Sequence, residues 1–131
     1  MLEALRRALD VEADVAYALV FGSRAGGRER PGSDVDVAIE LRPGAPRDIH
    51  ALGRLLARLE SAVGVRVDVV LLDEAPSPVA YRAFRDGQVV VERDRAALAA
   101  RKARAILEYL DFRPIEERCA TGVLRAAAGG R

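Results

Sequence analysis

The sequence is poor in several features, and each shortage excludes a class of protein. Cys119 is the only cysteine in 131 residues, so no disulfide can form within the chain. No apolar run reaches the length of about 20 residues that a membrane-spanning helix needs. The N-terminal residues lack the continuous apolar core of a signal peptide. We therefore expect a protein of the reducing cytoplasm with no membrane association.

Lysine is almost absent, because Lys102 is the only lysine among 21 basic residues and the others are arginines. A compositional bias of the genome is the simplest explanation. The alternative is that some arginines bind phosphate through their forked guanidinium groups. Acidic and basic residues nearly balance, with a net charge of +1. A chain of this charge has no overall attraction to nucleic acid, so we predict no direct nucleic-acid partner.

Several common motifs are also missing. The Gly-Lys-Ser/Thr sequence of a P-loop does not occur, and the glycines after the first predicted strand do not fit the spacing of a dinucleotide-binding turn. The pattern of alternating oxygen ligands that marks an EF-hand is absent too. His50 is the only histidine, so no histidine pair is available to bind a metal. These absences leave acidic residues as the candidates for metal chemistry.

The hydrophobic pattern predicts one α+β domain, in which a small mixed four-stranded sheet is covered by helices. We expect residues 1–94 to form the core, and residues 95–131 to form a helical extension that packs on the core or on a partner. The expected order is α-β-β-α-β-α-β-α-α. The predicted helices are 2–10, 47–63, 76–85, 95–110 and one that begins at Pro114, and the predicted strands are 15–21, 34–41, 65–72 and 88–92.

Three aspartates indicate the chemistry. Asp34 and Asp36 lie two residues apart in a predicted strand, so their side chains point to the same face. Two carboxylates this close repel each other unless a cation lies between them. A helix joins the second and third strands, so these strands can be neighbours and Asp68 can lie beside the pair. Three carboxylates suit Mg²⁺, and two such ions would clamp the attacking and leaving oxygens of an in-line phosphoryl displacement.

The turn that ends the first strand, Gly22-Ser23, is the candidate phosphate site. Backbone N–H groups that are exposed where a strand gives way to a helical turn bind phosphate well. Gly22 permits close approach of a polyphosphate, and Ser23 adds a hydroxyl group. Arg24 is either a ligand of the phosphate tail or a surface arginine. Ser33 either joins the nucleotide site or braces the start of the second strand.

The combination of Gly22-Ser23, Asp34-Val35-Asp36 and a later lone Asp68 resembles the polymerase-beta-like nucleotidyltransferase superfamily. Within it, the chain is similar to the minimal nucleotidyltransferase (MNT) group, whose members carry Gly-Ser-Arg-Ala-Arg-Gly before Ser-Asp-x-Asp. The chain departs from this pattern at Gly26, where the group often has arginine, and this departure could weaken nucleotide binding. Further similarity lies in Val67–Val70, in Ala75-Pro76, in Gly87–Asp94, and in Tyr109–Pro114, the last of which resembles the C-terminal part of MntA-type antitoxins.

This resemblance implies a magnesium-dependent protein adenylyltransferase. Members of the superfamily bind ATP or another NTP with Mg²⁺ and transfer a nucleoside monophosphate to a hydroxyl group. In MntA-type antitoxins, the acceptor is a tyrosine of a partner HEPN ribonuclease toxin, which the AMP groups silence. By position, Gly22 and Ser23 would hold the triphosphate, and Asp34 and Asp36 would bind both metal ions. Asp68 would complete the second metal site and could deprotonate the attacking hydroxyl.

Two alternatives to this function are open. The chain could be an antitoxin that masks its toxin by binding alone, with nucleotide as a regulator. It could also modify a hydroxyl of a small molecule such as an aminoglycoside. Enzymes of the second kind usually carry an extra domain for the acceptor, whereas only a short helical tail follows the fourth predicted strand here. This difference favours a macromolecular acceptor.

Overall fold

The structure, a computed structural model, describes residues 1–22 and 35–128, with side chains as far as Asp111. Within these residues, the strands form one mixed sheet in the order β3-β2-β1-β4, which confirms the predicted α+β class. Strand β1 is antiparallel to β2 and to β4, and β2 is parallel to β3. The elements are α1 (Leu2–Asp10), β1 (Val15–Phe21), β2 (Val35–Leu41), α2 (Ile49–Val63), β3 (Val67–Leu71), α3 (Ser77–Asp86), β4 (Gln88–Glu92) and α4 (Arg95–Ala128).

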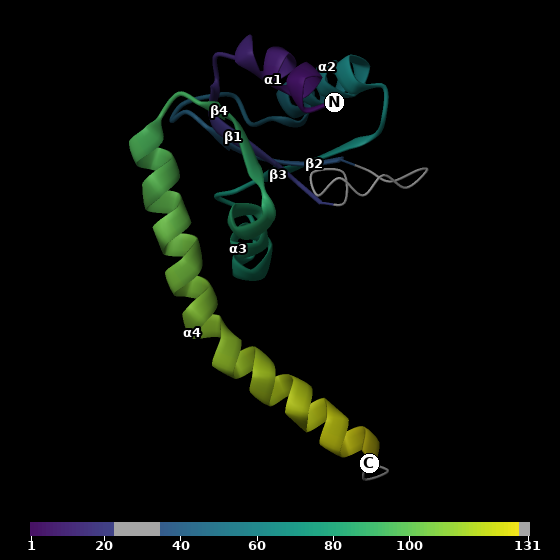
Figure 1. Cartoon of the computed structure of the whole chain (residues 1–131), viewed down its shortest axis with the longest axis vertical. Coiled ribbons are helices and arrows are strands. Elements are labelled where there is room, and N and C mark those ends of the chain that lie inside the picture. Colours follow the sequence, from purple (N-terminus) through teal and green to yellow (C-terminus); the bar gives the residue numbers. More distant parts are fainter. Residues whose placement is uncertain (23–34, 129–131) are drawn as a thin grey trace.

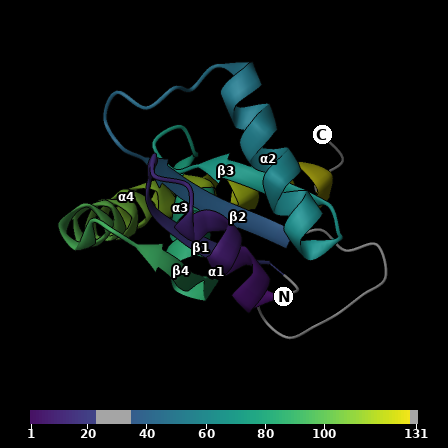
Figure 2. The same ribbon diagram turned by 90° about the horizontal axis from the view of Figure 1, so that it is seen from above.

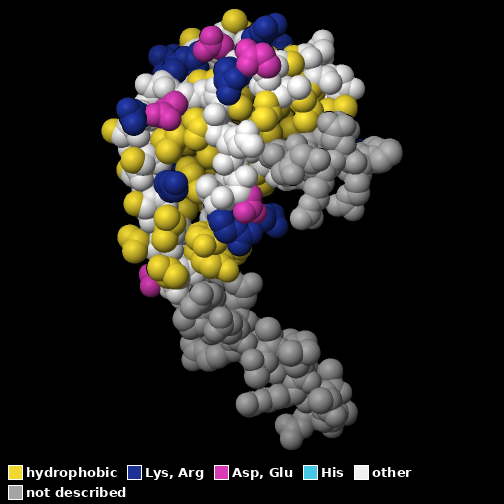
Figure 3. All heavy atoms as spheres, viewed as in Figure 1, with side chains coloured by type: hydrophobic (Ala, Val, Ile, Leu, Met, Phe, Trp, Pro, Cys, Tyr) yellow, Lys and Arg dark blue, Asp and Glu magenta, His cyan; other side chains and the backbone are white. Residues whose placement is uncertain are grey.

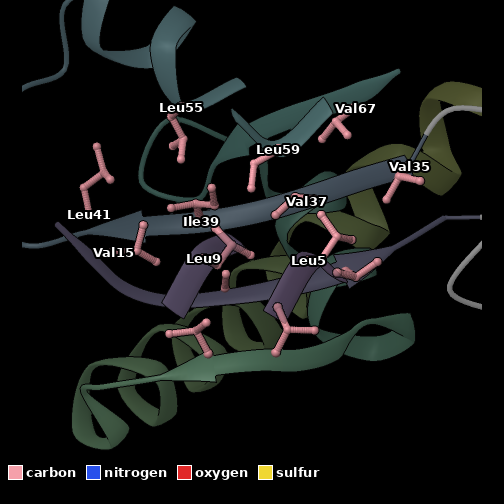
Figure 4. Packing of buried hydrophobic residues seen from close by; sticks show 14 residues of the cluster. Leu5, Leu9, Val15, Val35, Val37, Ile39, Leu41, Leu55, Leu59 and Val67 are labelled. Atoms are coloured by element: carbon pink, nitrogen blue, oxygen red, sulfur yellow. The ribbon is translucent and has the colours of Figure 1, made fainter. Parts of the chain in front are cut away.

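Helices lie on both faces of the sheet. Figures 1 and 2 show α1 and α2 on one face, with α3 and α4 on the opposite side. Leu5 and Leu9 of α1 and Leu55 and Leu59 of α2 are buried against the sheet, as Figure 4 shows. A second core lies on the α3 side, where Phe84 is buried. These two cores hold the sheet in place between the helix layers.

Strand β1 lies inside the sheet and is buried along its whole length, as its apolar sequence predicts. Strand β4 is at one edge of the sheet, also as predicted, and β3 is at the other. The chain leaves β1 at Gly22, directly after the buried residue Phe21. The position of this turn is therefore fixed by a strand with a neighbour on each side.

Helix α2 connects the parallel strands β2 and β3. It ends where the sequence predicts, at Gly64, which adopts a left-handed conformation with φ of 72°. The Gly64 N–H donates to the carbonyl oxygen of Glu60 at 2.8 Å. Because a helix fills the crossover, β3 can return beside β2 and run in the same direction.

The C-terminal region differs from the prediction of two helices that are separated near Pro114. One helix, α4, runs from Arg95 to Ala128. A proline inside a helix lacks the N–H donor and crowds the carbonyl four residues earlier, at a cost of about 3 kcal/mol. This cost falls on one turn of a long helix, which accommodates an internal proline by bending. Figure 1 shows that the axis of α4 does bend along its length.

Within its described residues, only a narrow strip of the surface of helix α4 packs against the rest of the molecule. Arg101 and Ala105 are buried there, and Nη2 of Arg101 donates to the carbonyl oxygen of Leu72 at 2.9 Å. The large apolar side chains of α4 in this region are exposed instead, with exposed fractions of 63% for Leu107 and 51% for Leu110. Figure 3 shows hydrophobic side chains along the described part of this helix. None of the helices, searched over the described residues, has the length and apolar composition of a membrane span.

Candidate active site

The register of two parallel strands places Asp36 and Asp68 side by side. Asp36 of β2 is the direct neighbour of Asp68 of β3. The residues that flank each aspartate, Val35, Val37 and Val67 among them, belong to the core under α1 and α2. Since strand side chains alternate, both aspartates point to the opposite face, on which α3 lies. Asp36 is half-buried and Asp68 is exposed.

Gly22 lies directly against the carboxylate of Asp36. Phe21 of β1 is the register partner of Asp36, so Gly22, which follows Phe21, lies beside the first residues of β2. Gly22 has φ of +96°, a conformation that side-chain-bearing residues rarely adopt. A Cβ atom at this position would lie 2.6 Å from Oδ2 of Asp36. The glycine therefore allows both the turn and the close approach of backbone to carboxylate.

Four of the predicted site residues lie outside the described residues. They are Ser23, Arg24, Ser33 and Asp34. Gly26, where the sequence departs from the MNT pattern, is also outside them. Among the residues that are described, no cluster of three or more Asp, Glu, His or Cys side chains is suited to a metal ion. The described site therefore consists of Gly22, Asp36 and Asp68.

The chemistry of this site is that of hard oxygen donors beside a backbone turn. Two neighbouring carboxylates fit Mg²⁺, which binds through one or two carboxylates and completes its coordination with water and phosphate oxygens. The Gly22 turn leaves room next to Asp36 because no Cβ atom fills that space. A polyphosphate could then approach the backbone within reach of a cation that the carboxylates hold.

A buried polar group lies further along the same face, and the sequence did not point to it. Glu40 is on β2, four residues after Asp36, and its surroundings include Arg101 of α4 and Tyr17 of β1. Burial, followed by the negative charge of Asp73, raises the pKa of Glu40 above its ordinary value. Burial and the nearby charge of Glu40 likewise raise the pKa of Tyr17. Arg101 is far from Glu40 in the sequence, so only the fold reveals this group.

Two tyrosines stack on the α3–α4 side of the molecule. The rings of Tyr81 and Tyr109 lie 4.0 Å apart and are nearly parallel, with an angle of 8° between their planes. The guanidinium group of Arg85 lies 5.7 Å from the centre of the Tyr81 ring. Tyr81 and Phe84 are three residues apart, which favours core packing over a base-stacking platform. Phe84 is in the core, whereas Tyr81 joins α3 to α4 by stacking.

Comparison with known proteins places the site residues in a family context. Residues 3–96 match the family model described as polymerase beta, nucleotidyltransferase. This segment includes every predicted site residue. None of the curated proteins matches the chain.

Solved structures share the fold over nearly the whole chain. A toxin–antitoxin structure with AMP-PNP has a TM-score of 0.77 and 20% identity, over 94% of this chain and 98% of that one. A complex of a tri-AMPylated Shewanella oneidensis HEPN toxin with an MNT antitoxin has a TM-score of 0.72 and 18% identity, over 95% and 99%. A structure described as a minimal nucleotidyltransferase is 30% identical, with a TM-score of 0.56 over 66% of this chain and 86% of that one.

Proposed function

The chain belongs to the polymerase beta nucleotidyltransferase family, and we propose that it transfers AMP from ATP to a tyrosine hydroxyl of a HEPN toxin, which makes it the antitoxin of a pair. The observation that carries this proposal is the pairing of Asp36 with Asp68 next to the Gly22 turn. The similarity of the fold to toxin–antitoxin complexes supports the choice of partner, since one of those complexes contains an AMPylated HEPN toxin. The AMP-PNP in another of them supports an adenine nucleotide as donor.

Each site residue has a distinct task in this proposal. The backbone at Gly22, together with Ser23, would hold the triphosphate, and Arg24 and Ser33 would contribute to the nucleotide site. Asp36 and Asp68, with Asp34 before them in the sequence, would hold Mg²⁺, with two ions proposed. When bound, Mg²⁺ would neutralise phosphate charge and help to align the attacking and leaving oxygens.

Asp68 is the carboxylate best placed to face the acceptor. It is exposed and lies on the edge strand, whereas Asp36 is half-buried between its neighbours. An acceptor hydroxyl that arrives from the open side of β3 would therefore meet Asp68 first. We assign to Asp68 the removal of the hydroxyl proton as that oxygen bonds to the α-phosphorus of ATP and pyrophosphate leaves.

Substitution of Asp36 by asparagine tests catalysis. Asp36→Asn keeps the size of the side chain and removes its charge, so we expect AMP transfer to fall at least a hundredfold. The assay is intact mass of the HEPN protein after incubation with ATP and Mg²⁺. Asp14→Asn is the matched control, because Asp14 forms an exposed ion pair with Arg42 at the opposite end of β1. Transfer by Asp36→Asn at the wild-type rate would sink the proposal.

A second candidate function is inhibition by binding alone, which the exposed apolar side of α4 favours. Leu107 and Leu110 are the large exposed hydrophobic residues at the end of the described side chains. A surface of this kind can support a stable complex without chemistry. Toxin inhibition by an excess of Asp36→Asn separates the two functions. Full inhibition without any AMP on the toxin would establish masking, and loss of inhibition would establish catalysis.

A further inference from the structure

A groove runs between α2 and the outer edge of β3, and Asp68 lies in its wall. Its volume is about 540 Å³. Apolar side chains line most of it, from Ile49, Leu52 and Leu56 on α2 and from Val69 on β3. Figure 2 shows α2 lying over the β3 side of the sheet. Asp68 thus borders this apolar surface, while the alternation of side chains along β3 directs its carboxylate to the opposite, α3 face of the sheet.

The edge of β3 offers backbone hydrogen-bonding groups to this groove. The Val35 N–H donates to Arg66 O, and the Leu72 N–H donates to Ile39 O. In a parallel ladder, these two bonds mean that the backbone N–H and C=O groups of even-numbered β3 residues point toward β2. Those of odd-numbered residues point away from the sheet. The Val67 N–H fits this pattern, since it donates to Oε2 of Glu60 on α2 at 3.0 Å.

The backbone of Val69 therefore faces away from the sheet. No described strand pairs with this edge, because β3 is last in the strand order. An extended peptide is the ligand that satisfies such an edge, since it supplies N–H and C=O groups at the same spacing. From Asp68 to Leu71 the strand rises about 10 Å, which matches about three residues of extended chain.

We propose that an extended segment of the protein acceptor pairs with β3 and places its apolar side chains in this groove. The acceptor tyrosine next to them then points to the other face of the sheet, where the Asp68 carboxylate lies. The inference rests on the proposed function. The segment pairs with the outer edge of β3 at Val69, and its apolar side chains cover Ile49, which is 81% exposed. A small-molecule acceptor would leave this surface uncovered, so the groove also accounts for a preference for polypeptide.

The groove is tested by substitution at its exposed rim. Ile49→Glu places a charge where an apolar contact is expected, without disturbing the core. We expect the KM for the HEPN acceptor to rise about tenfold or more, because the contact is lost and the new charge must be desolvated. The kcat at saturating acceptor and the affinity for AMP-PNP should stay within about twofold. Val11→Glu is the control, because Val11 is 78% exposed directly after the C-terminal end of α1 and lines no part of the groove.

Backbone pairing is tested separately with peptides. After the modified tyrosine has been mapped, peptides that span it are made with single N-methyl groups at successive positions. Methylation should lower transfer at alternate positions only, since alternate amides face the β3 edge. Equal transfer to all of the peptides would refute strand pairing.

The outcomes separate this inference from the function on which it rests. If the wild-type protein transfers no AMP, the proposed function fails and the inference with it. If the wild type transfers AMP and Ile49→Glu has the wild-type KM, the function stands and the groove is not the acceptor site. A rise in KM for Ile49→Glu, with no change for Val11→Glu, supports both.

Discussion

Substitution of Gly22 by alanine offers a sharp test of the site, because the structure supplies both the strain and a matched control. The backbone at Gly22 has φ of +96°, and the new Cβ would lie 2.6 Å from Oδ2 of Asp36. The carboxylate must move by about 0.8 Å to restore an ordinary contact of 3.4 Å. A displacement of that size at a reacting centre costs about a hundredfold in rate. We therefore expect transfer by Gly22→Ala to fall about a hundredfold.

Gly44→Ala separates this contact from backbone strain. Gly44 also has positive φ, at +84°, but nothing lies within 4 Å of the position of its Cβ. Each substitution should destabilise the fold by about 1–3 kcal/mol, because a residue with a side chain is forced into a rare conformation. For a chain of this size, that lowers Tm by about 3–12 °C. Only Gly22→Ala should also lose activity.

The assays are thermal unfolding and AMP transfer to the HEPN protein, both measured on the same preparations. Transfer is compared at a temperature well below either midpoint, so that all variants are folded. If Gly22→Ala lost stability like Gly44→Ala and yet transferred AMP at the wild-type rate, the close approach of Gly22 to Asp36 would have no role in the reaction. Such a result would refute the reasoning that links the turn to the carboxylate.

Two further predictions concern the fold. Leu59 is fully buried between α2 and the sheet, so Leu59→Ala should lower the free energy of unfolding by about 2–5 kcal/mol in urea titrations, and an effect below about 1 kcal/mol would contradict this packing. Burial raises the pKa of Glu40, so its charged form opposes folding and its protonated form does not. The folded state then holds its proton more tightly, and the contribution of Glu40 to stability is lost as pH rises through its folded-state pKa. Glu40→Gln should therefore raise Tm at pH 7 but not at pH 4, and an equal change at both values would contradict it.

The sequence alone was sufficient for most of the fold. The apolar run of β1, the alternation in β2 and β3 and the stripe of α2 each identify an element, because burial imposes a different period on strands and helices. The helix between β2 and β3 also allowed these strands to be predicted as neighbours, and the register confirms that Asp36 adjoins Asp68. The predicted family is confirmed by the match over residues 3–96.

Tertiary contacts decided what the sequence could not. The apolar residues of α4 predict a buried side, but Leu107 and Leu110 are exposed and Arg101 is buried instead. The reason is that the described part of α4 contacts the body of the molecule through α3 and β1, so its apolar stripe need not face the sheet. Pro114 predicts a break, but one unfavourable turn does not end a long helix. The groove beside β3 joins two elements, and no local pattern encodes it.

The two described carboxylates of the candidate site, those of Asp36 and Asp68, lie on strands that differ in how readily their backbone hydrogen bonds open. Asp36 belongs to β2, which has a paired strand on each side, whereas Asp68 belongs to β3, which has one. Interior strands exchange their amide hydrogens only when most of the molecule unfolds, while edge strands open in small local fluctuations. The candidate site therefore combines a carboxylate on an interior strand with one on an edge strand that opens more readily. Movements of β3 could separate and rejoin the carboxylates without unfolding the protein, and a peptide held along its edge would suppress them.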